Sequence, residues 1–285
     1  MGWTEGVNRG IGAAHRRGIL TSASLLANGA AFASAVELAR AEPALGVGVH
    51  LNLSDGPPIL SPWDVPSLIA QERRMGGGPG SLYTWLLLGR LDPGEVEREW
   101  DAQIGKVRDA GITPTHLDGH KHVHMIPGLF EIALRLAKRH GIPAIRISHE
   151  SPLLRDALST GSDFSPRAAL QRLQGRCVKL LTIHAAALAR RAGIASPDHF
   201  CGITQTGLLT EEGVAALLHN LPEGTTELMT HPGEADEELR RASTRLQKSR
   251  HTELFILTSP GIRNLIASQG IRLLHYGSVV RSNEK

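Results

Sequence analysis

The chain has 285 residues, a length that suits one large α/β domain. Its formal net charge is only +3 and its basic residues are scattered along helical stretches, so nucleic acid is not the expected partner. No apolar run approaches the roughly 20 residues that a membrane span needs, and no basic segment followed by an apolar one opens the sequence. Cys177 and Cys201 follow no metal or redox spacing, so we expect reduced packing thiols in a cytoplasmic protein.

Hydrophobic residues make up 41% of the chain and aromatic residues only 4%, so Ala, Leu, Ile and Val must build the core, as in layered α/β proteins. Helical spacing predicts helices over residues 7–17, 31–41, 81–88, 93–110, 127–140, 165–192, 211–221 and 259–269. Strands are expected over residues 19–26, 45–53, from 115 onward, 144–147, 197–203, 225–230 and 271–276. This alternation predicts an irregular (β/α) barrel of about seven mainly parallel strands.

Two features modify that simple α/β order. The predicted series begins with a helix, whereas a parallel α/β domain usually opens with a strand, so we expect the first strand to be missing before residue 1. Residues 54–80 hold five prolines and five glycines, which indicates a long insertion or lid loop inside a single domain spanning residues 1–285. Such a loop commonly carries substrate contacts. A disordered loop without such contacts is an equally good interpretation of the segment. The arginines and lysine between residues 240 and 250 are expected on a solvated helix face.

The segment Thr115–Met125 holds four histidines and one aspartate within nine positions. If it begins as a strand, side chains alternate between faces. His116, Asp118, His120, His122 and His124 then share one face. That face carries only groups for metal or proton chemistry, so we predict a functional site there.

Further polar residues fall at or just beyond the carboxyl ends of predicted strands, where α/β enzymes place their sites. They are His50, Arg146, the pair Asp198-His199, and His231. Imidazoles and a carboxylate from different strands suit one divalent metal ion, either Zn²⁺ or Mg²⁺, which polarises a carbonyl and activates water. No phosphate loop, Gly-x-Ser-x-Gly elbow or paired Cys and His points elsewhere, so metal-assisted hydrolysis is the reaction class that we expect.

Each candidate also has an ordinary structural interpretation. His50 and His120 are the expected metal ligands, although His50 could equally be a hydrogen-bonded core histidine. Asp118 could orient His120, act as a base or cap a turn. His231 could be the general acid that protonates a leaving amine, or a loop histidine.

His124, Arg146 and His199 are the expected substrate-binding residues. Arg146 could instead pair with a structural carboxylate, and His199 could belong to an orienting pair or a helix cap.

These motifs resemble the YdjC-like family of carbohydrate deacetylases, which includes the chitooligosaccharide deacetylases. The resemblance rests on Gly48-Val-His-Leu51, Thr113–Met125 and Glu227-Leu-Met-Thr-His-Pro-Gly233 among others. It implies an irregular (β/α) barrel, a divalent metal on His50 and His120, and hydrolysis of the N-acetyl group of an amino sugar. The family's third ligand is the second aspartate of an Ala-Asp-Asp-Phe-Gly motif. Its Phe-Gly pair would fall at Met1-Gly2, so the two aspartates are absent.

The resulting hypothesis is a metal-dependent hydrolase that removes N-acetyl groups from chitooligosaccharides or related glycoconjugates. Its expected partner is a small carbohydrate, and the resemblance implies a homodimer. Because the aspartates are absent, the alternative is a catalytically impaired or inactive barrel that binds sugar or metal. A metal-dependent sugar isomerase or aldolase is a weaker third reading.

Overall fold

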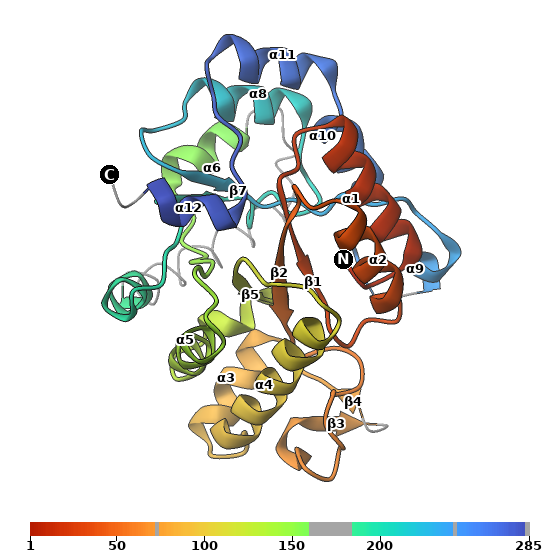
Figure 1. Cartoon of the computed structure of the whole chain (residues 1–285), viewed down its shortest axis with the longest axis vertical. Helices are drawn as coiled ribbons and strands as arrows, with labels where there is room; N and C mark the ends of the chain where they lie inside the picture. The colour runs from red at the N-terminus through yellow and green to blue at the C-terminus, as the bar shows by residue number, and fades with distance from the viewer. Residues whose placement is uncertain (72–73, 160–183, 242–243, 283–285) are drawn as a thin grey trace.

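The computed structural model describes residues 1–71, 74–159, 184–241 and 244–282, and helices surround a group of short central strands (Figure 1). Strands β1 (Ser22–Leu25), β2 (Gly46–Leu51) and β5 (Leu117–Gly119) form a parallel sheet in the order β1-β2-β5. Its register pairs His50 with Asp118, so both side chains leave the same face of neighbouring strands.

The sheet continues beyond β5 through single parallel bridges, between Leu117 and Ile145 and between Ala144 and Ala195. Glu150 then bridges to Phe200 in β6 (His199–Cys201), which is parallel to β7 (Thr226–Leu228). The expected strands around residues 144, 199 and 226 are therefore present, the first as isolated bridges. The result is an α/β arrangement with mainly parallel strands, consistent with a barrel-like fold.

Seven of the described helices lie near predicted ones: α1 (Glu5–Arg17), α2 (Phe32–Ala41), α3 (Pro79–Leu87), α4 (Pro93–Asp109), α5 (Leu129–His140), α8 (Glu211–His219) and α11 (Pro260–Ser268). Four others are absent from the predicted series: α6 (Pro152–Leu158), α9 (Glu237–Arg241), α10 (Lys248–Leu257) and α12 (Tyr276–Ser282). Of these, α9 and α10 include the ends of the basic segment 240–250 that was expected on a helix face. Residues 184–192 are also helical, and most of the helix predicted over residues 165–192 lies outside the described residues. None of the described helices has the length and apolar character that a membrane span requires.

Local sequence explains several helix ends. The Thr4 hydroxyl accepts a hydrogen bond from the Val7 amide at the start of α1, and Asp92 does the same for Gly94 before α4. Gly141 ends α5 in the left-handed conformation that glycine adopts without a Cβ penalty. The buried faces of these helices join β1, β2 and β5 in one large aliphatic cluster, and α6, α8, α10 and α11 contribute to a second.

The predicted alternation through the histidine segment is wrong beyond Gly119. Strand β5 ends there, and residues His120–Met125 form the 3-10 segment η2, in which Lys121 and His122 have φ of 51° and 58°. These positive values turn the backbone out of the extended conformation, so strand parity no longer relates His120, His122 and His124.

Two other expectations need correction. Residues 271–275 form no strand. Their contacts with β1 and the residue before it are made by side chains and not by a backbone ladder, since Thr21 Oγ1 donates to Leu274 O and Ser22 Oγ accepts from Tyr276 N. The segment 54–80 is not a structureless loop. It contains η1 (Pro66–Leu68) and an antiparallel pair, β3 (Ile69–Gln71) and β4 (Arg74–Met75).

The outer edge of β1 carries one further backbone pairing. The Met1 amino group donates to Ser24 O at 2.7 Å, and Leu26 N donates to Met1 O at 3.1 Å. These are the two bonds of a parallel bridge centred on Leu25. The rest of that edge, like the edge of β7 away from β6, has no strand partner among the described residues.

Candidate functional site

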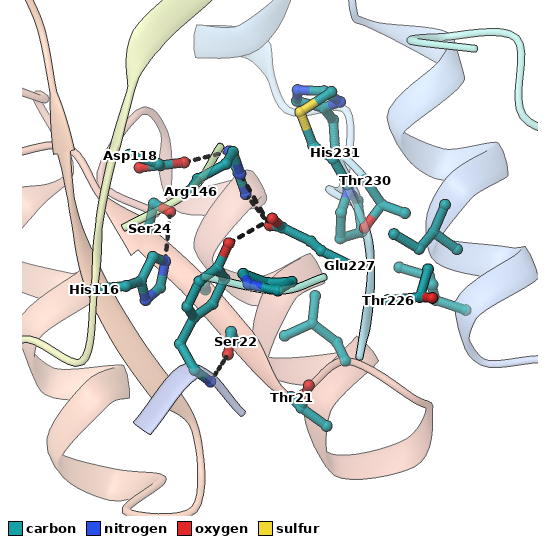
Figure 2. A pocket seen from close by; sticks show the side chains of 18 of the residues that line it. Thr21, Ser22, Ser24, His116, Asp118, Arg146, Thr226, Glu227, Thr230 and His231 are labelled. Carbon is teal, nitrogen blue, oxygen red and sulfur yellow. Dashed lines mark hydrogen bonds and ion pairs between the residues drawn. The ribbon is translucent and has the colours of Figure 1, made fainter. Parts of the chain in front are cut away.

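A cavity of about 1230 Å³ opens between the carboxyl end of the sheet and the β6-β7 pair. Ser22 and Ser24 of β1 line one side, and Thr226, Glu227 and Thr230 line the other (Figure 2). Eight of the residues that the sequence marks for the site also line it, and they are His50, His116, Asp118, His120, His122, Arg146, Asp198 and His231. The fold therefore brings together residues that lie up to 181 positions apart in the sequence.

His50 is held by Asp118 across the β2-β5 pair. Its Nδ1 lies 2.8 Å from Asp118 Oδ1, and its side chain is 24% exposed whereas that of Asp118 is 1% exposed. The carboxylate therefore orients the imidazole and leaves Nε2 as the ring nitrogen without an assigned partner. Burial opposes the charge of Asp118, but His50 and the Arg146 guanidinium outweigh it and hold the pKa of that carboxyl well below its usual range.

Arg146 is a buried link between two carboxylates. Its Nη1 donates to Asp118 Oδ2, and its Nε and Nη2 donate to Glu227 Oε1 at 2.9 and 2.6 Å. The Tyr276 hydroxyl donates to the other oxygen of Glu227. Figure 2 shows this chain of contacts crossing the cavity wall from β5 to β7. Burial alone would lower the pKa of Arg146, but Glu227 and Asp118 raise it, so the guanidinium stays charged.

His116 serves packing on the same wall. Its ring stacks on Tyr276 with centroids 3.9 Å apart, and its Nε2 lies 3.3 Å from Ser24 Oγ. A Cβ at Gly48 would lie 2.5 Å from this ring, so glycine on β2 makes the space that the imidazole fills. Burial lowers the pKa of His116 to about 3, which keeps the ring neutral.

His120 lies beside His50, with ring centroids 5.4 Å apart. Its Nε2 is 2.8 Å from Asp55 Oδ2, which also accepts from Lys121 Nζ at 2.6 Å. Burial would raise the pKa of Asp55, but the hydrogen bonds from His120 and Lys121 lower it to about 2. Asp55 is therefore an ionised carboxylate next to the two imidazoles.

Of the last two histidines of the segment, His122 lines the cavity and His124 does not, and both rings have a partner within the protein. His122 Nδ1 lies 2.7 Å from Ser148 Oγ, and His124 Nε2 lies 3.0 Å from Arg146 O. His124 is fully buried and is not among the cavity-lining residues. His199 is also absent from that lining, and its Nε2 lies 3.2 Å from Glu223 O.

His231 lies three residues beyond the end of β7 and lines the cavity. Its amide donates to Glu253 Oε2, and its carbonyl accepts from Arg250 Nη1 at 3.4 Å. Burial and the nearby charge of Arg250 hold the pKa of the imidazole well below 6.5, so the ring is neutral at pH 7. Its Nδ1 is buried without a hydrogen-bond partner. Arg250 is 8% exposed, so the expected solvated face does not include it.

The side chains around His50 and His120 supply only part of a ligand set for a metal ion. Among the residues that the structure describes, no group of three or more His, Cys, Asp and Glu side chains is arranged to hold one. His50 and His120 are adjacent, but both oxygens of Asp118 are committed to His50 and Arg146. The described residues therefore do not form a complete metal site.

Four site residues escaped the sequence analysis: Asp55, Glu227, Glu253 and Tyr276. Asp55 follows the carboxyl end of β2 by four residues, and His231, which was a candidate, follows that of β7 by three. Glu227 lies inside a predicted strand, where a carboxylate needs a buried partner. Tyr276 lines the cavity and Glu253 accepts from the His231 amide, both through contacts distant in sequence, so no local signal marked them.

The chain is similar to known proteins over nearly its whole length. The model of the family described as YdjC-like protein matches residues 1–268. A protein of Brevibacillus brevis named "Carbohydrate deacetylase" is 33% identical over 280 residues, which cover 98% of this chain and 96% of the relative. A "Chitooligosaccharide deacetylase" of Enterobacter sp. strain 638 is 32% identical over 278 residues, or 96% and 93% of the two chains.

A solved structure also matches. The crystal structure of a protein of Enterococcus faecalis V583, provisionally named a cellobiose-phosphate cleavage protein, superposes with a TM-score of 0.77 at 28% identity. The match covers 98% of this chain and 95% of that one. The family match, the relatives and the shared fold agree over nearly the whole chain, which therefore belongs to the YdjC-like protein family.

Proposed function

We propose that this protein is a carbohydrate deacetylase, a hydrolase that removes N-acetyl groups from amino sugars such as chitooligosaccharides. The observation that carries the proposal is the cavity in which His50, His120, Asp118 and His231 meet, in a chain whose relatives are named deacetylases. Its substrate is a small carbohydrate. The buried free thiol of Cys201 supports a reducing, cytoplasmic setting.

His231 is the proposed proton carrier. Hydrolysis adds water to the acetyl carbon, breaks the C–N bond and delivers a proton to the amine. A neutral imidazole takes the proton from the attacking water and then gives it to the departing nitrogen. The pKa of His231, held well below 6.5, leaves the ring deprotonated and able to take a proton, and it makes the protonated ring a strong acid toward the departing nitrogen.

Asp118 is the proposed positioning residue. Each of its oxygens accepts a hydrogen bond, one from His50 and one from Arg146, so Asp118 orients His50 and fixes its tautomer. Arg146 contributes by holding Asp118 in place. His124 and His199 remain predicted substrate-binding residues.

We further propose that one divalent metal ion, Mg²⁺ or Zn²⁺, binds His50 and His120 when a third ligand completes the set. The resemblance to the YdjC-like family implies that this ligand is the second aspartate of an Ala-Asp-Asp-Phe-Gly motif at the end of the family's first strand. The edges of β1 and β7 beside the cavity have no strand partner among the described residues over most of their length, which supports a further parallel strand between them.

The test compares residues 1–285 with a form extended N-terminally through an Ala-Asp-Asp strand, measuring metal content and acetate release from di-N-acetylchitobiose. We expect the extended form to bind one ion and release acetate, and its His50→Ala, His120→Ala and His231→Ala variants to lose activity. Fully active, folded variants would refute the proposed site. Equal metal binding by both forms would refute the completing strand.

A second candidate function is a catalytically impaired barrel that binds sugar or metal. The incomplete donor set of the described residues favours it. Sugar binding without acetate release, even in the extended form, would support this alternative over the deacetylase.

A further inference from the structure

The four tryptophans of the chain, all within the described residues, lie in different surroundings. Trp100 is a fully buried residue of α4, and Trp63 is 78% exposed on the segment that precedes η1. Trp85 packs beside Gly77 and the main core. Trp3 differs from all three because it lines the cavity while remaining partly buried against the same core.

Trp3 extends a row of rings along the cavity wall. Its ring centroid lies 5.3 Å from that of His120 at an interplanar angle of 47°, and His120 lies 5.4 Å from His50. Asp55 contacts His120 and also pairs with Lys121. The side chains of Asp55 and Lys121 are 36% and 44% exposed. An aromatic face therefore stands next to the imidazoles, with a carboxylate and an ammonium group beside it.

Hydrogen bonds anchor the backbone on both sides of Trp3. Gly2 N donates to Asn8 Oδ1 at 2.7 Å, and Thr4 caps α1. Asn8 in turn donates to Ala31 O and Ser34 Oγ, at 3.0 and 2.7 Å. These bonds fix the backbone of Trp3, and the packing of its ring against His120 and the core restricts the side chain, so little conformational entropy is lost on binding.

We propose that Trp3 is the platform against which the apolar face of the substrate's pyranose ring packs, with Asp55 and Lys121 as hydrogen-bonding groups for its hydroxyls. An indole face is electron-rich and apolar, and it attracts the C–H groups that a pyranose presents on one side. Such pockets combine an apolar wall with a few placed polar groups. This subsite rests on the proposed function, since it orients an amino sugar toward His50 and His120.

The test uses Trp3→Leu, which keeps an apolar side chain against the core but removes the aromatic face, and Trp3→Phe, which keeps a smaller face. Trp63→Leu is the matched control, because Trp63 lies outside the cavity lining. Calorimetric titration with di-N-acetylchitobiose measures Kd, and circular dichroism checks the fold. We expect Trp3→Leu to weaken binding about tenfold, Trp3→Phe to recover part of this loss, and Trp63→Leu to change nothing.

Unchanged binding by folded Trp3→Leu overturns the platform, and so does the absence of binding by the unsubstituted protein. If Trp3→Leu fails to fold, Trp3→Phe decides. Weaker binding by Trp3→Phe with unchanged binding by Trp63→Leu supports the platform, whereas unchanged binding by Trp3→Phe, or an equal loss in both variants, overturns it. The two proposals fail separately. If the protein binds sugar in a way that depends on Trp3 but releases no acetate, the proposed deacetylase function is refuted. If Trp3→Leu releases acetate with an unchanged KM, only the proposed role of Trp3 is refuted.

Discussion

Two carboxylates on neighbouring parts of the cavity wall are held in different ways. Asp118 is 1% exposed and shared by His50 and Arg146, whereas Asp55 is 36% exposed and accepts from His120 and Lys121. Water cannot replace a lost partner of Asp118, but it can replace one of Asp55. Asp118 is therefore a rigid support for His50, whereas Asp55 lies at the rim of the cavity and can rearrange when a ligand binds.

The largest expected effect is on the rigid side. Arg146→Met removes the cation that neutralises Asp118 and Glu227, leaving two buried carboxylates without their partner. We expect the free energy of unfolding to fall by roughly 3–5 kcal/mol. Urea denaturation followed by circular dichroism measures it. The matched control is Arg240→Met, whose ion pair with Glu237 is 57% and 60% exposed and should change stability by less than about 1 kcal/mol. Equal losses in both variants would contradict the distinction.

A second, smaller effect is expected behind His231. Burial raises the pKa of Glu253 to about 7, although the His231 amide and the Arg250 charge oppose the shift. A carboxyl whose pKa is raised on folding adds stability that is fully present below its unfolded value of 4.5, and this stability is lost as the pH rises through 7. The loss is on the order of 3 kcal/mol.

Glu253→Gln removes this titration while keeping an acceptor for the His231 amide. We expect the stability of the unsubstituted protein relative to Glu253→Gln to decline between pH 4.5 and pH 7, measured by urea denaturation at several pH values. A difference that stays constant over this range would show that Glu253 titrates normally in the folded protein.

The smallest effect is expected on the exposed side. Asp55→Asn weakens the contacts to His120 and Lys121, but solvent reaches all three groups, so we expect a stability change below about 1 kcal/mol. Asp118→Asn is the buried counterpart and should cost several times more. Thermal unfolding of the two variants gives the ratio directly, and similar losses would mean that Asp55 is as structural as Asp118.

The sequence predicts local order well and long-range partners poorly. Thr4, Pro93 and Gly141 mark helix ends through bonds within one turn, so the helices appear near their expected places. Lys121 and His122 have positive φ although neither is a glycine, so the sequence gives no sign of the turn. The alternating strand pattern is therefore predicted to extend beyond the true end of the strand.

The candidate site shows the same limit. Parallel strands meet at one end, so His50, Asp118 and His231 could be grouped from their positions alone. Arg146 was considered for either substrate or carboxylate binding, and its partner Glu227 lies 81 residues away. Only the folded chain shows which carboxylate faces it.

The stacking of Tyr276 on His116 joins the end of the chain to the centre of the sheet. Tyr276 begins α12, and its hydroxyl reaches Glu227 while its ring covers the imidazole that Gly48 accommodates. Any change that displaces His116 thus loosens the anchor of α12. Protease sensitivity around Arg272 then becomes a simple external reporter of whether the inner wall of the cavity is intact.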